Sequence, residues 1–244
     1  MISVVVPLRN ESAGIEALEA SLSKLRDALN DKRLELVFID DGSTDGTADR
    51  IHKVFCPKWD YKLTRHETNL GVGAAFRTGF DRACGEIVCT IDADCTYPPE
   101  ELSRLVAALE QTGADVATAS PYHPEAGVTN AVPWRLFLSR GLSFIYRRVS
   151  PVRIHTYTSI FRAYRRPVIR RVSFQASDFI CAAEILFLAA AQGRRILEVP
   201  MPLRVRQSGR SKLPVWKTIL GHLRLIDRIL RGRLDRNASA ARPG

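Results

Sequence analysis

The sequence predicts an α/β protein with a mainly parallel sheet flanked by helices. Short β-branched runs alternate with helical segments over the first 120 residues, and two of the predicted strands end in acidic pairs. Strands that alternate with helices form βαβ units, so these strands are expected to run parallel. A chain of 244 residues is long enough for one large domain with its own core.

The first half of the chain carries the clearest alternation. Residues 2–7 form a β-branched run typical of a strand buried on both faces. Apolar residues at three- and four-residue steps over 15–29 predict a helix with one face on the core. The same signals predict strands at 34–39, 61–65, 86–91 and 115–119, and helices at 48–55, 72–84 and 99–111.

The second half is less regular. We expect a loop at 121–133, a helix at 133–149, a strand at 156–164, a helix within 176–192 and a last helix at 215–231. The strand-like segment 196–205 contains Pro200 and Pro202, which confine it to a sheet edge.

Composition limits the possible classes of protein. The formal net charge is +10, and residues 204–236 alone hold ten basic and two acidic residues, which suits contact with phosphates, anionic lipid or acidic ligands. The five cysteines form no CxxC pair, so they are expected to be reduced thiols rather than zinc ligands. No secretory signal is recognisable, and no apolar run approaches the ~18 residues that span a bilayer; any membrane contact is expected to be peripheral.

The acidic pairs are the strongest chemical signal. Asp40 and Asp41 follow one strand, and Asp92 and Asp94 follow another. Ligands of such sheets bind beyond the carboxyl ends of the strands, where both pairs would meet. Two nearby carboxylates repel unless a proton or cation lies between them, and hard divalent cations prefer oxygen ligands. A DxD pair can also be an ordinary strand-end turn, and Ser43, Thr44 and Asp45 suit turn and helix-cap chemistry.

Six short motifs of the chain resemble those of a known protein family and occur in the same order. The segments are VVVPLRNE, FIDDGSTDGT, NLGVGAAFRTGF, IDADCTYPPEEL, SIFRAYRR and VRQSGRSKL. With them the chain, almost to Leu213, resembles the family 2 glycosyltransferases of the GT-A fold, and most closely their dolichyl- and polyprenyl-phosphate sugar synthase branch.

The resemblance implies a site. Asp92 and Asp94 would hold Mg²⁺ or Mn²⁺ against the diphosphate of a nucleotide sugar, and the segment with Arg206, Ser211 and Lys212 would close over the donor and acceptor phosphates. The implied donor-binding residues are Pro7, Arg9, Glu11, Ile39, Asp41, Asp92, Ala93 and Asp94, and the implied catalytic residues are Asp92, Asp94 and Arg206. Arg162, Arg165 and Arg166 are weaker phosphate-binding candidates.

The resemblance also implies the organisation and the activity. Residues 1–213 would form the GT-A domain, with a nucleotide-sugar half at 1–120 and an acceptor half at 121–213. Beyond the resemblance, the residue pattern predicts a basic amphipathic helix at 214–232 and a disordered tail at 233–244. The expected enzyme is an inverting, metal-assisted glycosyltransferase that moves a sugar from a GDP- or UDP-sugar to a polyprenyl or dolichyl phosphate. It would lie at the cytoplasmic face of the membrane, without spanning it and without a nucleic-acid partner.

Other interpretations remain open. The acceptor can be a glycan, a protein or another lipid; a sugar nucleotidyltransferase or a nucleic-acid-binding module are rival classes. The apolar stripes of the helices at 133–149 and 215–231 suit either a membrane surface or the domain's own core. Glu184, the lone charge of an apolar helix, is expected to pair with an arginine.

The chain departs from the branch at a few positions. Thr96 stands where close members carry glutamine, Pro121 near an arginine position and Ile180 near a lysine position. Thr156 and Ile160 replace an aspartate and a glycine. These changes bear on the donor sugar, the nucleotide and the acceptor rather than on the metal carboxylates.

Overall fold

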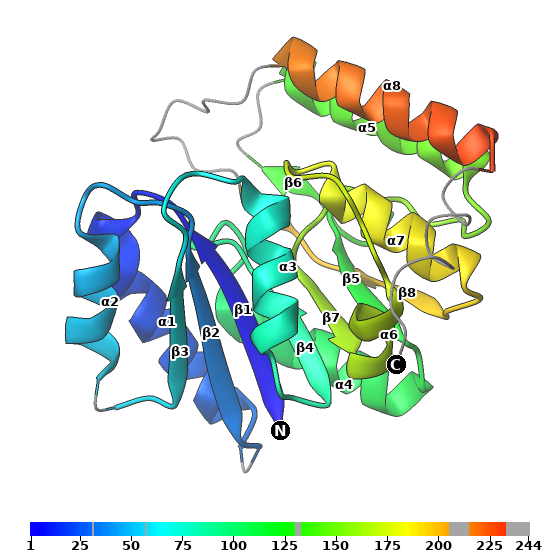
Figure 1. The fold of residues 1–244 in the computed structure, drawn as a ribbon. Helices are drawn as coiled ribbons and strands as arrows, with labels where there is room; N and C mark the ends of the chain where they lie inside the picture. The colour runs from blue at the N-terminus through cyan, green and yellow to red at the C-terminus, as the bar shows by residue number, and fades with distance from the viewer. Residues whose placement is uncertain (31, 57, 130–132, 205–214, 233–244) are drawn as a thin grey trace.

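A seven-stranded sheet with helices on both faces forms the body of the molecule (Figure 1). The computed structural model describes residues 1–30, 32–56, 58–129, 133–204 and 215–232. The sheet order is β3-β2-β1-β4-β7-β5-β8. These strands are β1 (Ile2–Leu8), β2 (Leu34–Asp40), β3 (Tyr61–Arg65), β4 (Ile87–Thr90), β5 (Val116–Ser120), β7 (Arg162–Arg165) and β8 (Ile196–Pro200). A separate parallel pair joins β6 (Val128–Thr129) to β9 (Leu203–Arg204).

One strand runs against the others. Strand β7 is antiparallel to both of its neighbours, β4 and β5, whereas all other pairings in this sheet are parallel. Because β4 and β5 are both opposed to β7, they run in the same direction. The carboxyl ends of β1, β2, β4 and β5 therefore meet at one edge of the sheet.

Alternate residues of each strand face two separate cores. Val4 and Val6 of β1 face one core and Val5 faces the other, and all three are fully buried. Helices α1 (Ile15–Ala28), α2 (Thr47–Phe55) and α4 (Leu102–Thr112) cover the first core, and α3 (Val72–Arg82), α6 (Arg166–Arg171) and α7 (Cys181–Ala191) cover the second. Short 3-10 turns, η1 (Ser12–Gly14) and η2 (Pro99–Glu101), precede α1 and α4.

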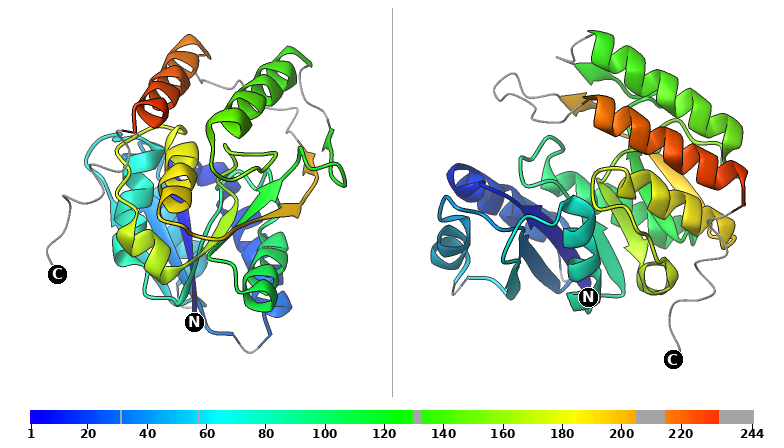
Figure 2. Two further views of the ribbon diagram at one scale, coloured as in Figure 1. Left: turned by 90° about the vertical axis from the view of Figure 1, so that its right-hand side faces the viewer. Right: turned by 45° about the horizontal axis from the view of Figure 1, so that its top comes forward.

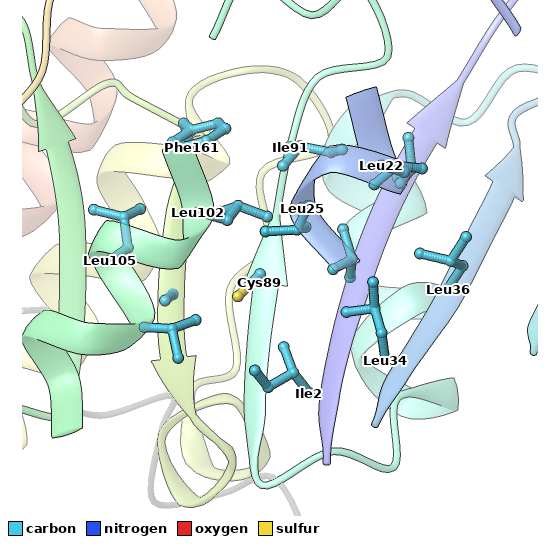
Figure 3. Close-up of a cluster of buried hydrophobic side chains, with 14 of the residues drawn as sticks. Ile2, Leu22, Leu25, Leu34, Leu36, Cys89, Ile91, Leu102, Leu105 and Phe161 are labelled. Carbon is cyan, nitrogen blue, oxygen red and sulfur yellow. The ribbon is translucent and has the colours of Figure 1, made fainter. Parts of the chain in front are cut away.

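The first core is made of aliphatic side chains from both layers. Figure 3 shows Leu25 of α1 beside Leu102, with Cys89 of β4 below them and Ile91, which follows β4, above Cys89. Cys89 is fully buried and belongs to no disulfide. Burial raises the pKa of its thiol, which fits the expectation of a reduced, unreactive cysteine.

Two further helices lie outside the three layers. Helices α5 (Pro133–Val149) and α8 (Val215–Leu230) lie side by side above the carboxyl edge of the sheet, next to α7 (Figures 1 and 2). The Tyr146 hydroxyl of α5 and His222 Nδ1 of α8 are 2.7 Å apart, and both side chains are buried. Gly221 fits against Ile180, since an added Cβ would lie 2.0 Å from its Cδ1. None of the described helices is long and apolar enough to cross a membrane.

Most predicted elements are confirmed, several to within a residue or two. The helix at 133–149 and the strand at 61–65 match their predicted bounds, and β8 is an edge strand as its prolines indicated. The predicted strand at 156–164 is wrong over most of its length, because only Arg162–Arg165 pairs in the sheet. Helix α6 and strand β6 were not predicted. The division at residue 120 stays a prediction, although both halves contribute strands to one sheet, and the tail at 233–244 lies outside the described residues.

His222 makes the packing of α8 sensitive to pH. Burial lowers its pKa from 6.5 to about 4, against the opposing effect of the Asp178 charge. Between pH 4 and pH 6.5, His222 is protonated in the unfolded chain but not in the folded protein. Its contribution to the unfolding free energy is therefore fully present above pH 6.5 and is lost as the pH falls towards 4.

We expect His222→Gln to remove this loss, because glutamine can accept the Tyr146 hydrogen bond without titrating. Between pH 7.5 and 4.5 the wild type should lose about 2–3 kcal/mol more unfolding free energy than the variant, measured by denaturant titration. The same loss in both proteins would show that His222 is not the titrating group.

Candidate active site

The loops that follow β1 and β2 are tied together by hydrogen bonds. The amide of Asn10 donates to Ser43 Oγ at 2.9 Å and that of Glu11 to Thr47 Oγ1 at 3.0 Å. Further back, Pro7 and Ile39 lie opposite each other in the two strands, and Arg9 is exposed. Pro7, Arg9, Glu11 and Ile39, all predicted to bind the donor, are thus on neighbouring strand ends.

Asp45 acts as the predicted turn residue of this region. It accepts hydrogen bonds from the amides of Ser12 and Thr47, at 3.0 and 3.1 Å. Burial alone would raise its pKa, but the Thr47 hydroxyl and the bonds from Ser12 and Thr47 outweigh it and lower the pKa to about 2. The carboxylate therefore stabilises the loop as an anion.

Asp41 holds the segment that follows β3. Its carboxylate accepts the amide protons of Leu70 and Gly71 at 2.9 and 2.8 Å, and His66 Nδ1 lies 2.8 Å from the same carboxylate. Three of its roughly four acceptor positions are thus used within the protein. A nucleoside contact by Asp41 stays a prediction, and its observed partners make it the anchor of residues 66–71.

Asp40 is also buried but is less completely satisfied. Its Oδ1 accepts the Ser43 amide at 2.9 Å, while Arg65 Nε lies 3.5 Å from Oδ2. Oδ2 has no hydrogen-bond partner among the described residues. The charge of this buried carboxylate is paired with Arg65.

The DxD segment forms a turn rather than the end of a strand. Strand β4 stops at Thr90, and Cys95 takes a positive φ of 54°. Asp94 Oδ1 accepts the Thr96 amide at 2.8 Å, which fixes the turn. This turn brings Asp92 and Asp94 within electrostatic reach of each other.

Asp92 carries the clearest electrostatic strain of the site. Burial, followed by the charges of Asp94 and Glu11, raises its pKa from 3.8 to about 7. The effect of Glu11 shows that the loop after β1 approaches the DxD turn. Three carboxylates near one another stabilise a bound cation, which would remove the repulsion that raises this pKa.

The residues present fit a divalent cation shared with a substrate. No group of three or more His, Cys, Asp or Glu side chains in the described part of the chain could hold a metal ion by itself. Mg²⁺ is commonly held by one or two carboxylates together with substrate phosphates and water. Asp92 and Asp94 suit this arrangement, in which the diphosphate would complete the coordination.

A pocket of about 240 Å³ opens beside Asp92 on the other side from β1 and β2. The side chains that line it are mostly hydroxyls and apolar groups from the second half of the chain. They are Asp92, Thr96, Tyr97, Pro121, Tyr122, Ser139, Thr156, Thr158, Ser159, Ile160, Phe161, Phe179 and Leu203.

Glu198 of β8 holds one wall of this pocket. Its Oε1 accepts the amides of His155 and Thr156 at 2.6 and 2.9 Å, and its Oε2 lies 2.8 Å from His155 Nδ1. The Thr156 hydroxyl in turn lies 2.8 Å from that of Ser120. The wall at 155–156 is therefore positioned by hydrogen bonds from two strands.

Comparison with known proteins identifies the family. The model of glycosyl transferase family 2 matches residues 3–173 of the chain. This match covers more than half of the sequence. The chain belongs to glycosyl transferase family 2.

Related sequences agree with this assignment, and the protein is a glycosyltransferase. The polyprenol monophosphomannose synthase of Mycolicibacterium smegmatis is 32% identical over 98% of this chain and 91% of its own length. The dolichol-phosphate mannosyltransferase of Pyrococcus furiosus is 32% identical over 96% of this chain and 66% of its own length. The predicted resemblance to the polyprenyl-phosphate branch is confirmed by these relatives.

Solved structures show the same fold. The glucosyl-3-phosphoglycerate synthase from Mycobacterium tuberculosis, in complex with Mn²⁺, UDP and glucosyl-3-phosphoglycerate, has a TM-score of 0.69 at 22% identity and covers 96% of this chain and 80% of its own. S. aureus TarS 1-349 in complex with UDP-GlcNAc has a TM-score of 0.64 at 22% identity, covering 93% and 66%. The predicted GT-A fold is confirmed.

Some predicted residues of this glycosyltransferase cannot be placed. Arg206, Ser211 and Lys212 lie outside the described residues. Arg162 is fully buried in β7, where its guanidinium donates to the carbonyl oxygens of Tyr157 and Ala182 at 2.7 and 2.5 Å. It therefore braces the sheet and is not a phosphate ligand.

Sequence reasoning missed other residues of the site. His66 follows β3 directly and links Asp41 to Thr78, whose hydroxyl is 2.9 Å from its Nε2. Its position at a strand end could have revealed it. The pocket residues Tyr97 and Phe161, with ring centroids 5.0 Å apart, meet only through the tertiary fold.

The loop held by Asp41 packs against the segment before α7 without free space. The Gly73 amide donates to the Ser177 carbonyl at 2.8 Å, and a Cβ on Gly73 would lie 2.0 Å from the Ala176 carbonyl oxygen. We expect Gly73→Ala to lower the unfolding free energy by about 2 kcal/mol, since backbone must move to admit the methyl group.

Gly141→Ala is the matched control, because Gly141 lies in α5 and an added Cβ meets nothing within 4 Å. This variant should be neutral or stabilised by up to about 1 kcal/mol, as alanine favours a helix. Equal thermal unfolding of the two variants would contradict the close contact at Gly73.

Proposed function

We propose that the protein is an inverting glycosyltransferase that moves a sugar from a nucleotide diphosphate sugar, GDP- or UDP-linked, to a polyprenyl or dolichyl phosphate. The observation that carries the proposal is the strained carboxylate of Asp92, beside Asp94 and next to a pocket at the carboxyl edge of the sheet. The names of the relatives support the lipid phosphate acceptor.

The two sides of Asp92 suit the two substrates. The loops after β1 and β2, with Glu11 and Asp41, would take the nucleoside, and the pocket beyond Asp92 would take the sugar and the acceptor group. A Mg²⁺ or Mn²⁺ ion held by Asp92 and Asp94 would neutralise charge on the departing diphosphate. The solved neighbour that contains Mn²⁺ and UDP supports this use of a metal.

The chemistry needs little more from the protein than position. A phosphate monoester is already an anion near neutral pH, so no dedicated base is needed to activate it. Attack on the anomeric carbon opposite the leaving diphosphate inverts the configuration of that carbon. The side chains of the site then orient two phosphates and screen their repulsion, a role that also suits Arg206, Ser211 and Lys212.

The departures from the branch favour an unusual sugar or acceptor. Thr96, Pro121, Thr156 and Ile160 all line the one pocket beside Asp92. Ile180, the fifth departure, does not line this pocket. The four departures that line it support, as a second candidate, a family 2 transferase whose acceptor is a glycan, a protein or another lipid.

The exposed side chains of α5 and α8 are a further argument for an acceptor that lies in a membrane. Seven of the ten large hydrophobic side chains that are exposed in the described part of the chain lie on these helices. They are Phe137, Leu138, Phe144, Ile145, Leu220, Leu223 and Leu230. The exposed Arg140, Arg147 and Arg148 lie among them, a combination that suits an anionic lipid surface.

The two helices therefore have two faces. Tyr146, His222, Leu225 and Ile226 are buried against the domain, while Phe137, Leu138, Ile145, Leu223 and Leu230 of the predicted stripes are exposed. The buried face supports packing on the domain's own core, and the exposed face is the part that we propose to meet a membrane. We place the protein at the cytoplasmic face of a membrane, with the pocket just below the helices that would meet the lipid.

The transfer reaction tests the proposed function. Purified protein, Mn²⁺, polyprenyl phosphate and radiolabelled UDP-, GDP- or dTDP-sugars should give a labelled product that extracts into organic solvent with one of the donors. Asp94→Asn should lower the rate at least about a hundredfold, because the metal loses a ligand.

Asp49→Asn, which removes an exposed carboxylate of α2, should leave the rate unchanged. Product on a soluble glycan but not on the lipid would select the second candidate. An unchanged rate in Asp94→Asn would remove the metal role assigned to the DxD turn.

A negative charge placed on the exposed face of α5 or α8 tests the proposed membrane contact. Phe137 is 77% exposed and Leu223 52% exposed, so Phe137→Glu and Leu223→Glu should leave thermal unfolding unchanged. Each should weaken sedimentation with anionic phospholipid vesicles about tenfold or more, since an apolar anchor is replaced by a repelled charge.

Ala20→Glu adds the same charge at an exposed position of α1 and should leave vesicle binding almost unchanged. Equal weakening by Ala20→Glu would indicate a net-charge effect and contradict a docking face made by α5 and α8.

A further inference from the structure

Helix α8 is tied to the domain by one ion pair with a buried member. Arg228 Nη1 donates to Glu184 Oε1 on α7 at 2.9 Å, and the Glu184 side chain is completely buried. The predicted pairing of Glu184 with an arginine is confirmed. A buried carboxylate is tolerated only where partners satisfy its charge and its lone pairs.

The other oxygen of Glu184 fixes the segment that leads into α7. Oε2 accepts the amide protons of Gln175 and Ala176 at 3.1 and 2.8 Å. One carboxylate thus connects the basic side chain of α8 to the backbone at 175–176. The position of that backbone depends on how Glu184 is held.

This segment supports the loop anchored by Asp41. Arg77 Nη1 donates to the Ala176 carbonyl at 3.0 Å, and the Gly73 amide donates to the Ser177 carbonyl at 2.8 Å. A Cβ on Gly71, whose φ is +92°, would lie 2.2 Å from the Ser177 oxygen. The two backbones therefore cannot shift independently at this contact.

The last contact in the series reaches Asp41, which lies on the side of the site that we propose to bind the nucleoside. The Gly71 amide that lies against Ser177 donates to Asp41 Oδ2 at 2.8 Å. An unbroken series of contacts joins Arg228 of α8 to Asp41 at the end of β2. Figure 1 shows the same arrangement, with α8 above α7 and with α3 between α7 and the first strands.

We propose that α8 is a positioning element for the donor site: the Arg228–Glu184 pair holds the 175–177 backbone, which in turn holds residues 70–73 on Asp41. This inference rests on the proposed function, in which Asp41 belongs to the nucleoside side of the site. Arg228 and Glu184 touch no substrate and act through the backbone. A helix that would meet the lipid surface therefore also determines how tightly the nucleotide sugar is bound.

Loss of the Arg228 side chain should weaken binding of the donor. Without it the Glu184 carboxylate is left buried with no cation beside it, and it must take up a proton or draw water between α7 and α8. Either change weakens its hold on the amides of Gln175 and Ala176. Residues 70–73 then lose their support at 175–177. The DxD turn is still fixed by Asp94, and the pocket wall is still held by Glu198.

Arg228→Gln should therefore raise the KM for the donor and the Kd for the matching nucleoside diphosphate about tenfold. The kcat at saturating donor should change less than about twofold. Arg228→Lys keeps the charge and should recover most of the affinity. If α8 served only as a membrane anchor, Arg228→Gln would leave the donor KM and the nucleotide Kd unchanged when no membrane is present.

Arg231→Gln is the matched control. It removes the same charge from an ion pair with Asp227, one turn further on, in which both side chains are about half exposed. Exposed pairs contribute little, so this variant should bind the nucleotide like the wild type. Equal effects of Arg228→Gln and Arg231→Gln on nucleotide affinity would overturn the inference.

Hydrogen exchange tests the same support without any substrate. In Arg228→Gln the amides of Gly73, Gln175 and Ala176 should exchange faster than in Arg231→Gln, and unchanged exchange would overturn the inference even if activity were lost. Absence of nucleotide binding by the wild type would instead count against the proposed function, and the exchange comparison would still decide the role of α8.

A double variant covers the case in which Arg228→Gln folds poorly. Glu184→Gln/Arg228→Gln contains no unpaired charge, and its amide oxygen can still accept the backbone protons. Its nucleotide affinity and exchange rates should lie nearer the wild type than those of Arg228→Gln. Strict additivity of the two single changes would show that the residues do not act through each other.

Discussion

The mutual repulsion of carboxylates at the end of β4 is the constraint on which the site depends. Asp92 lies close enough to Asp94 and Glu11, and is sufficiently removed from water, that its pKa rises to about 7. Carboxylates whose pKa is raised by burial and by neighbouring charges are common at functional sites. In the proposed reaction, a divalent cation shared with the diphosphate of the donor would remove this repulsion.

The fold concentrates this charge by its topology. Because β7 runs against its neighbours, β4 and β5 point the same way, and the ends of β1, β2, β4 and β5 share one edge. Near β1 and β2 that edge is stiffened by backbone amides bound to Asp41 and Asp45, and near β5 and β8 by Glu198. Helices α5 and α8 lie over this edge (Figure 2). Several of their apolar side chains are exposed.

Local sequence signals were sufficient for most of the fold and for the acidic pairs. The β-branched runs and the regular apolar spacing identify strands and helices because each is a short-range pattern. The pairing of Glu184 with an arginine also follows from the sequence, since a lone charge in an apolar helix must be compensated. The particular partner, Arg228, could not be predicted, because the pair joins residues 44 apart across two helices.

The remaining features depend on long-range contacts or on geometry that changes within one residue. The shape of the turn at 92–95 could not be predicted, because the left-handed conformation of Cys95 is not indicated by any local sequence pattern. The antiparallel β7 replaces a longer predicted strand, since only four of its residues find partners in the sheet. Arg162 resembles a phosphate ligand in sequence but is buried among neutral acceptors.

Electron paramagnetic resonance of Mn²⁺, titrated with and without the nucleoside diphosphate of the preferred donor, tests most directly whether Asp92 and Asp94 hold a cation against a diphosphate. The wild type should bind Mn²⁺ weakly alone and much more tightly with the nucleotide, and Asp92→Asn should lose that enhancement. Equal Mn²⁺ affinity of the two proteins in the presence of nucleotide would contradict the metal-centred site.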